Sequence, residues 1–404
     1  MTTSMTRTEP ATAGRHVGLA ILALAVGGFA IGTTEFMTMG VLPQVADGVG
    51  VSIPSAGHAI SAYALGVVVG VPLLSLTLAG RPRRAVLIGL MLAYALGNLG
   101  TAMAQSYGEL VVARFLDGLP HGAYFGVASL VAAQMSQRRG RAVAMVMMGL
   151  SVANVLGVPA ATWLGEHVGW RAAYVSAAGL ALLTAVMVRA FVPPLPAQPD
   201  TNLRAEAFGF FRSVPVWLTL VASAGGFAGM FAVYSYIARI VTDVAHLPES
   251  DTPWFVLAYG LGMVVGTWLA GELTHWSVFG TLLLGTGGSV LALIAFWWSA
   301  PVAWLLLLMC FTVSVLASLL AIGFQLRLME AAHGAENLGA AMNHASLNVA
   351  NALGAWMGGA VIAAGYGYRA PALVGAGAAL FGLVMVLAAV AYASRNRFAA
   401  SAGV

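Results

Sequence analysis

Hydrophobic residues run through this chain in long blocks separated by short polar connections. A helix needs about 20 mostly apolar residues to cross a bilayer, and twelve blocks reach that length. The connections, such as GRPRR at residues 80–84 and AQSYG at 104–108, leave little room for domains outside a membrane. The pattern predicts an all-α integral membrane protein with transmembrane helices at residues 17–41, 54–79, 85–104, 109–134, 142–165, 171–192, 213–238, 252–271, 277–298, 301–325, 337–364 and 370–393.

The first block follows two arginines, Arg7 and Arg15, as the hydrophobic region of a signal peptide would. It is longer than such a region, and no clear cleavage site follows it. We therefore expect it to be retained as the first transmembrane helix.

Composition supports a membrane protein and excludes several other classes. Of the 404 residues, 60% are hydrophobic and 8% are charged, against about 25% charged in soluble proteins. The chain has no lysine, so it cannot form the Walker A loop of an ATP-driven motor. Cys310 is the single cysteine, so no disulfide is expected. Neither an HExxH nor a GxSxG motif is present, and we predict no enzyme, no metal site and no cofactor.

Arginines in the connections orient the chain. Fourteen fall on one side of the predicted membrane and three on the other. Arginine-rich loops stay in the cytoplasm, so both termini are expected there, on a multi-pass protein of the cytoplasmic membrane. The pI near 9.4 therefore reflects topology, and no nucleic-acid partner is predicted. The fourteen are Arg7, Arg15, Arg81, Arg83, Arg84, Arg138, Arg139, Arg141, Arg189, Arg204, Arg212, Arg327, Arg395 and Arg397; the three are Arg171, Arg239 and Arg369.

The second half of the chain repeats the first. AYALGVVVG at residues 62–70 returns as AYGLGMVVG at 258–266, VANVLG at 152–157 as VANALG at 349–354, and GWRA at 169–172 as GYRA at 367–370. The offsets are 196, 197 and 198 residues. Six helices per repeat return the chain to its starting side, so the halves should be related by an axis along the membrane normal, with a substrate path between them.

We predict three parts from this repeat. Residues 1–192 form an N-terminal six-helix bundle and residues 213–404 a C-terminal one. Residues 193–212 are rich in proline and polar side chains and are expected to be a cytoplasmic linker between them.

Few ionisable residues fall inside the predicted helices. Glu35 lies in the first, within IGTTEFMTMG, and has no partner in its own helix. Such a charge is costly in a bilayer and marks a functional position. A carboxylate there can bind a proton or a substrate, and competition between the two would couple their fluxes. We therefore predict that Glu35 couples transport to protons.

The fourth and eleventh helices carry further polar stripes. Arg114, Asp117 and His121 are spaced to share one face, which should meet the central cavity or another helix, and Asp117 is a candidate for proton coupling. An ion pair that only orients the helix, and histidines or asparagines that only bond neighbouring helices, remain alternatives. We expect the substrate cavity to be lined by Tyr63, His121, Asn154, Tyr234, His344, Asn348 and Asn351.

These features resemble the major facilitator superfamily along nearly the whole chain. FAIGTTEFMTMGVLPQVA, ARFLDGLPHGAYFGVA and LGVPAATWLGEHVGWRA are similar to its proton-coupled efflux branch, which includes arabinose-efflux-like permeases, chloramphenicol-resistance exporters and purine-nucleoside exporters. The resemblance implies a proton-coupling role for Arg114 and a protonation role for Glu35. It also implies that Gly157 and Pro159 belong to an antiport element, and that Arg83 and Arg84 gate alternating access.

The chain departs from the family pattern at two places. Ala79 and Ser75 stand where the second loop of the family carries an aspartate and a glycine. In the fifth helix Val158 separates Gly157 from Pro159.

The leading hypothesis is a monomeric secondary transporter that exports a small amphipathic compound, such as a phenicol-type antibiotic, in exchange for protons. Proton-coupled export of sugars or purine nucleosides is one alternative. An uncoupled facilitator is another.

Overall fold

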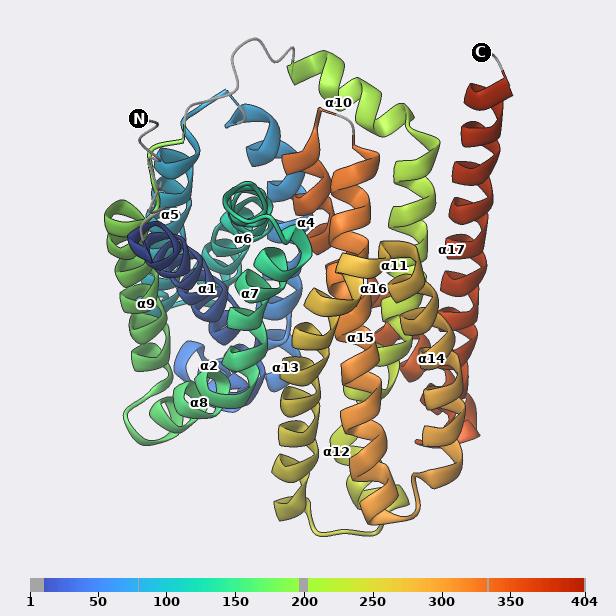
Figure 1. The fold of residues 1–404 in the computed structure, drawn as a ribbon. Helices are drawn as coiled ribbons and strands as arrows, with labels where there is room; N and C mark the ends of the chain where they lie inside the picture. The colour runs from blue at the N-terminus through green and yellow to red at the C-terminus, as the bar shows by residue number, and fades with distance from the viewer. Residues whose placement is uncertain (1–10, 79, 196–202, 333, 403–404) are drawn as a thin grey trace, which may run out of the picture.

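The computed structural model describes residues 11–78, 80–195, 203–332 and 334–402, and within them the chain is almost entirely helical (Figure 1). The long helices of the first half are α1 Ala11–Gly40, α4 His58–Thr77, α5 Arg83–Met103, α6 Tyr107–Met135, α7 Arg139–Val152 with its continuation α8 Val158–His167, and α9 Trp170–Phe191. Those of the second half are α11 Val214–Tyr234, α13 Thr252–Trp276, α14 Val278–Ser299, α15 Ala303–Ala331, α16 Glu336–Val361 and α17 Ala370–Ala402.

Shorter elements connect these helices. They are α2 Leu42–Val49, α3 Ile53–Ala56, α10 Leu203–Arg212, α12 Ile237–Arg239, the 3₁₀ turn η3 Glu249–Asp251, and the π-helical turns η1 Ala153–Gly157, η2 Ile240–Val244 and η4 Ile362–Tyr366.

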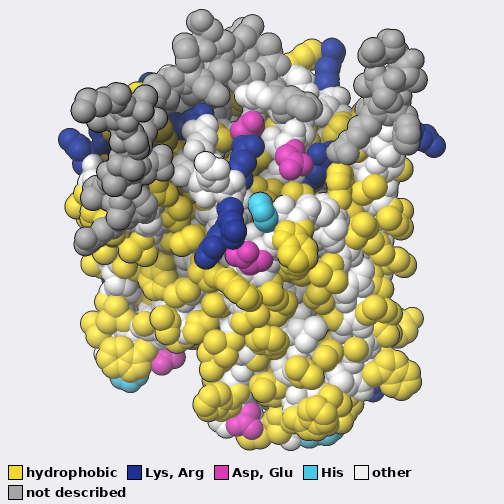
Figure 2. Space-filling view, in the orientation of Figure 1, with side chains coloured by type: hydrophobic (Ala, Val, Ile, Leu, Met, Phe, Trp, Pro, Cys, Tyr) yellow, Lys and Arg dark blue, Asp and Glu magenta, His cyan; other side chains and the backbone are white. Residues whose placement is uncertain are grey.

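The predicted all-α transmembrane fold is confirmed. Eleven helices of the described chain are long and apolar enough to cross a membrane. The twelfth is α6, which has 29 residues but carries the polar stripe of Arg114, Asp117 and His121. Large apolar side chains cover the outside, among them Leu96 at 69% and Leu291 at 71% exposure, as expected of helices that face lipid. In the space-filling view, basic side chains gather in the upper half of the face shown (Figure 2).

Helices α1 to α9 lie on the left of Figure 1 and helices α11 to α17 on the right, and we call these two groups the first and the second bundle. Helix α10 crosses the top of the view between them, so we call this end of the molecule the linker end. Residues 196–202 of the expected linker lie outside the described residues, and so does Ala79 of the loop after the second helix.

The sequence repeat is reproduced in packing detail. A Cβ atom added to Gly66 would lie 2.1 Å from the Phe115 carbonyl oxygen, and one added to Gly262 would lie 2.4 Å from that of Phe311. Both residues of the second pair stand 196 positions after those of the first. In each bundle, therefore, a glycine lets α4 or α13 approach the backbone of α6 or α15.

The arginines of the GWRA and GYRA copies also make equivalent hydrogen bonds. Arg171 Nη2 donates to the Ala104 carbonyl oxygen at the end of α5, at 2.9 Å. Arg369 Nη2 donates to the Trp297 carbonyl oxygen near the end of α14, at 2.6 Å. Cations at helix C-termini satisfy the free carbonyls there. Two of the three arginines opposite the linker end thus have a structural explanation.

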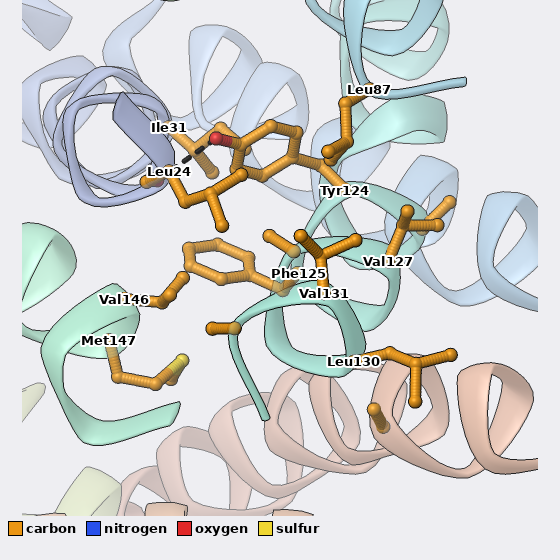
Figure 3. Packing of buried hydrophobic residues seen from close by; sticks show 14 of the residues in the cluster. Leu24, Ile31, Leu87, Tyr124, Phe125, Val127, Leu130, Val131, Val146 and Met147 are labelled. Carbon is orange, nitrogen blue, oxygen red and sulfur yellow. Dashed lines mark hydrogen bonds between the residues drawn. The ribbon is translucent and has the colours of Figure 1, made fainter. Parts of the chain in front are cut away.

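The core of the first bundle centres on aromatic residues of α6. Phe125 packs among Leu24, Val131 and Val146, while the Tyr124 hydroxyl donates to the Leu24 carbonyl oxygen at 2.9 Å (Figure 3). The middle of α6 is thereby fixed against α1 and α7. This rigid contact positions the polar residues described next.

Candidate functional site: a cavity between the bundles

A cavity lies between the two bundles. Its wall is mostly aromatic, methionine and leucine side chains, interrupted by a few polar groups. The first bundle contributes Glu35, Phe36, Met147, Leu150 and Asn154; the second contributes Phe227, Met230, Phe231, Tyr234, Tyr259, Met263, Ala317, Ser318, Ala321, Leu347, Asn348 and Asn351.

Glu35 is the one charged residue in this wall. It follows the close-packed part of α1, where a Cβ on Gly32 would meet the Ala153 Cβ at 3.0 Å. Within the described residues, no side chain forms an ion pair or hydrogen bond with Glu35. Its carboxyl group is therefore available to the contents of the cavity.

The polar residues of the wall come from both repeats. Asn154 and Asn351 are repeat counterparts, and the structure brings both to the cavity with Asn348 and Tyr234. The sequence prediction did not include Tyr259, the counterpart of Tyr63. The hydroxyl of Tyr259 is buried and has no hydrogen-bond partner in the described chain. The repeat of AYALG as AYGLG could have predicted it, because Tyr259 takes the place of Tyr63 there.

Arg114 and Asp117 lie outside the cavity wall, inside the first bundle. Both are fully buried, and Arg114 Nη1 donates to Asp117 Oδ2 at 2.6 Å. Asn98 Nδ2 donates to the other carboxylate oxygen at 2.8 Å, and Thr34 Oγ1 donates to Asn98 Oδ1 at 3.2 Å. Thr34 precedes Glu35 in α1, so this polar network ends one residue from the cavity. Sequence reasoning missed both Asn98, an amide in an apolar block, and Thr34, which stands directly before Glu35.

Tyr63, His121 and His344 also lie outside the cavity wall. Tyr63 is buried beneath Arg114, whose guanidinium carbon lies 4.2 Å from the ring centroid. This is a close cation–π contact. The Tyr63 hydroxyl lies 2.9 Å from His121 Nδ1, and the other nitrogen of His121 faces His344 across the bundle interface. These three residues therefore connect the bundles and do not contact the cavity.

Gly157 and Pro159 lie at a π-helical turn inside the fifth transmembrane helix, which runs from Arg139 to His167. Residues 153–157 form this turn, η1, and Pro159 follows it in α8. A Cβ on Gly157 would lie 2.1 Å from Thr33 Oγ1. Such π turns are frequent at functional sites, and this one carries Asn154 into the cavity.

Arg83 and Arg84 lie at the linker end. Arg83 Nη1 donates to the Gln134 side-chain oxygen of α6, and Arg84 Nη1 donates to the Val192 carbonyl oxygen at 3.3 Å. Both contacts stay within the first bundle. Ser75, in the second helix, is buried, and its hydroxyl has no partner among the described residues.

Contacts between the bundles close the linker end. Ser151 lies 2.9 Å from Thr267, and Gln325 donates to Ser129 at 2.6 Å. Nearer that end, Glu272 lies 3.9 Å from Arg138 and 3.7 Å from Arg141, and Arg139 lies 3.5 Å from Glu336. The polar contacts between bundles in the described chain all lie between mid-depth and the linker end. The cavity is thus shut off from that end.

No cluster of three or more metal-binding side chains occurs in the described part of the chain.

Two repeated helical bundles around a mid-depth cavity define the class of secondary transporters. The sequence matches the Major Facilitator Superfamily over residues 24–343, and the chain belongs to this family. Its members are transporters and not enzymes.

Several transporters are similar over most of their length. The chain is 40% identical to the inner membrane transport protein YdhP of Escherichia coli K12 over 387 residues, covering 91% of this chain and 94% of that protein. It is 35% identical to the putative transporter AraJ of the same strain, covering 87% and 90%. It is 32% identical to a chloramphenicol resistance protein of Streptomyces lividans, covering 83% and 87%.

Solved structures show the same fold at low sequence identity. The proton:xylose symporter XylE aligns with a TM-score of 0.75 over 93% of this chain and 95% of its own, at 14% identity. The transporter FucP in its outward conformation aligns with a TM-score of 0.71 over 93% and 99%, also at 14% identity.

Proposed function

We propose that this transporter exports a small amphipathic compound in exchange for protons, by alternating access of the cavity to the two membrane faces. The observation that carries the proposal is the position of Glu35, an unpaired carboxyl group in an otherwise apolar cavity wall. Proton and cargo would compete for this group. Moving one charge through 100 mV supplies about 2.3 kcal/mol, enough for roughly a fortyfold concentration ratio.

The proposed orientation places the linker end in the cytoplasm, with both termini there. The arginine bias of fourteen to three supports it. The proposed unit is a monomer, because one chain supplies all the residues of the cavity wall. In this orientation the structure is closed to the cytoplasm.

A phenicol-type antibiotic is the first substrate to test. The wall combines phenylalanines and methionines with asparagine amides and tyrosine hydroxyls, which suits an aromatic molecule with a few polar groups. The similarity to the chloramphenicol resistance protein supports this choice.

The test uses purified protein in liposomes with an imposed pH gradient. Accumulation of labelled chloramphenicol should follow the gradient, and Glu35→Gln should abolish the gradient-driven part while the protein stays folded. Glu166→Gln is the matched control. Glu166 is exposed on α8, so this variant should transport normally. Full gradient-driven accumulation by Glu35→Gln would refute the role of this residue.

A sugar or purine nucleoside is the second candidate class. Asn154, Asn348 and Asn351 supply three amides that could bind hydroxyl groups or a base. A similar protein of Pasteurella multocida is a probable sugar efflux transporter, at 24% identity. The same liposomes loaded with labelled arabinose or inosine separate the classes. Movement of any cargo that ignores the pH gradient would indicate an uncoupled facilitator.

A further inference from the structure

Two histidines join the bundles at mid-depth. Nε2 of His121, on α6, and Nδ1 of His344, on α16, are 3.3 Å apart. The His344 ring also stacks on Phe125, with ring centroids 4.2 Å apart and planes 10° from parallel. Phe125 belongs to the first-bundle core (Figure 3). His344 is therefore a second-bundle side chain held by the first bundle.

Both histidines are buried in this arrangement, His121 at 1% and His344 at 2% exposure. His344 Nε2 has no hydrogen-bond partner in the described chain. Separating α6 from α16 would break the contact between the rings, remove the stacking on Phe125 and give both rings access to water. The protonation of the pair is thus tied to the distance between the bundles.

Only one hydrogen atom can lie between the two facing nitrogens. If both imidazoles were fully protonated, two N–H groups and two positive charges would oppose each other across 3.3 Å. The closed pair therefore holds at least one proton fewer than two separated imidazoles that are both protonated.

Among the described residues, the groups around the pair offer no free negative charge to balance a second proton. On α6 itself, Arg114 adds positive charge, and Asp117 is already bound by Arg114 and Asn98. Helices α4 and α5 contribute the phenols of Tyr63 and Tyr94, whose oxygens are 3.1 Å apart. Besides His344, helix α16 carries Glu336 at the linker end, where it pairs with Arg139, and Glu35 of α1 faces the cavity.

We propose that His121 and His344 form a proton-operated latch at mid-depth, which keeps the linker ends of the two bundles together when at most one imidazole is charged and releases them when both are. The latch is separate from the proton exchange proposed for Glu35. It sets which membrane face the cavity opens to, and it operates without cargo.

The size of the effect follows from the proton count. A hydrated histidine titrates near pH 6.5. If the open state binds one proton more than the closed state, the ratio of open to closed molecules should rise about 30-fold between pH 8 and pH 5.

The experiment measures the separation of the linker ends directly. Spin labels are placed at Gln137 and Glu330, which face each other across the bundles there, in a chain whose buried Cys310 is replaced by alanine. Pulsed electron resonance gives the distance distribution at each pH in detergent, without substrate. A long-distance population should grow between pH 8 and pH 5. A distribution unchanged over this range overturns the latch.

Variants identify the titrating groups. His344→Gln and, independently, His121→Gln should flatten the pH response. His275→Gln is the matched control, because His275 lines the same end of the interface and its loss should leave the response intact. Glu35→Gln should also keep the response. A response lost in Glu35→Gln but kept in both latch variants would overturn the latch and assign the proton to the cavity.

Discussion

The buried ion pair of α6 gives a prediction whose size can be worked out from the structure. Asp117 is the only hydrogen-bond acceptor of Arg114 in the described chain; Nε and Nη2 of Arg114 are buried without partners. Asp117→Asn removes the negative charge but nearly preserves the shape. It leaves the guanidinium, at 0% exposure, without its ion-pair partner and in contact with the rings of Tyr63 and Tyr174.

Breaking one side of a buried pair costs about 3–5 kcal/mol. We expect Asp117→Asn to lower the free energy of unfolding in mixed micelles, measured by denaturant titration, by that amount. The control is Asp243→Asn. It breaks an exposed pair with Arg239 at 4.0 Å and should cost less than about 1 kcal/mol.

The second repeat supplies a sharper variant. The residues 196 positions after Arg114 and Asp117 are Cys310 and Val313, both buried in α15. A helix in this position therefore packs without an ion pair. We expect Arg114→Leu combined with Asp117→Val to recover most of the stability lost by Asp117→Asn, while gradient-driven transport is lost. Equal instability of the double variant and Asp117→Asn, or wild-type stability of Asp117→Asn, would refute the reasoning.

Three further predictions follow from single contacts. Gly157→Ala places a Cβ 2.1 Å from Thr33 Oγ1; it should destabilise by about 1–3 kcal/mol in denaturant titration, whereas Gly179→Ala, with open space around it, should have no such effect. Tyr259→Phe removes a buried hydroxyl without a partner. The free energy of unfolding should be unchanged or rise by about 1 kcal/mol. If the hydroxyl contacts the cargo, the affinity for cargo in binding titrations should fall. Glu272→Gln removes two half-exposed contacts; it should raise the open fraction of spin-labelled protein about two- to fivefold, and an unchanged fraction would show that these pairs do not hold the linker end shut.

Sequence reasoning located the helices because apolar length is set by bilayer thickness, a constraint that acts on each segment separately. It also found the repeat, whose equivalent contacts at Gly66 and Gly262 the structure reproduces. It could not decide which face of α6 meets the cavity. The side chains of Arg114, Asp117 and His121 could avoid lipid by facing either the cavity or helices α4 and α5. Only packing, through Tyr63 and Asn98, selects the second.

A comparison of the two repeats explains why the two bundles contribute unequally to the cavity wall. Of its 17 wall residues, 12 come from the second bundle. The counterpart of His121 is Ala317, and Ala317, Ser318 and Ala321 form the α15 part of the wall. Small side chains on α15 leave space where α6 is filled by charged and aromatic groups. The first repeat thus carries the buried polar network, and the second repeat supplies most of the cavity wall.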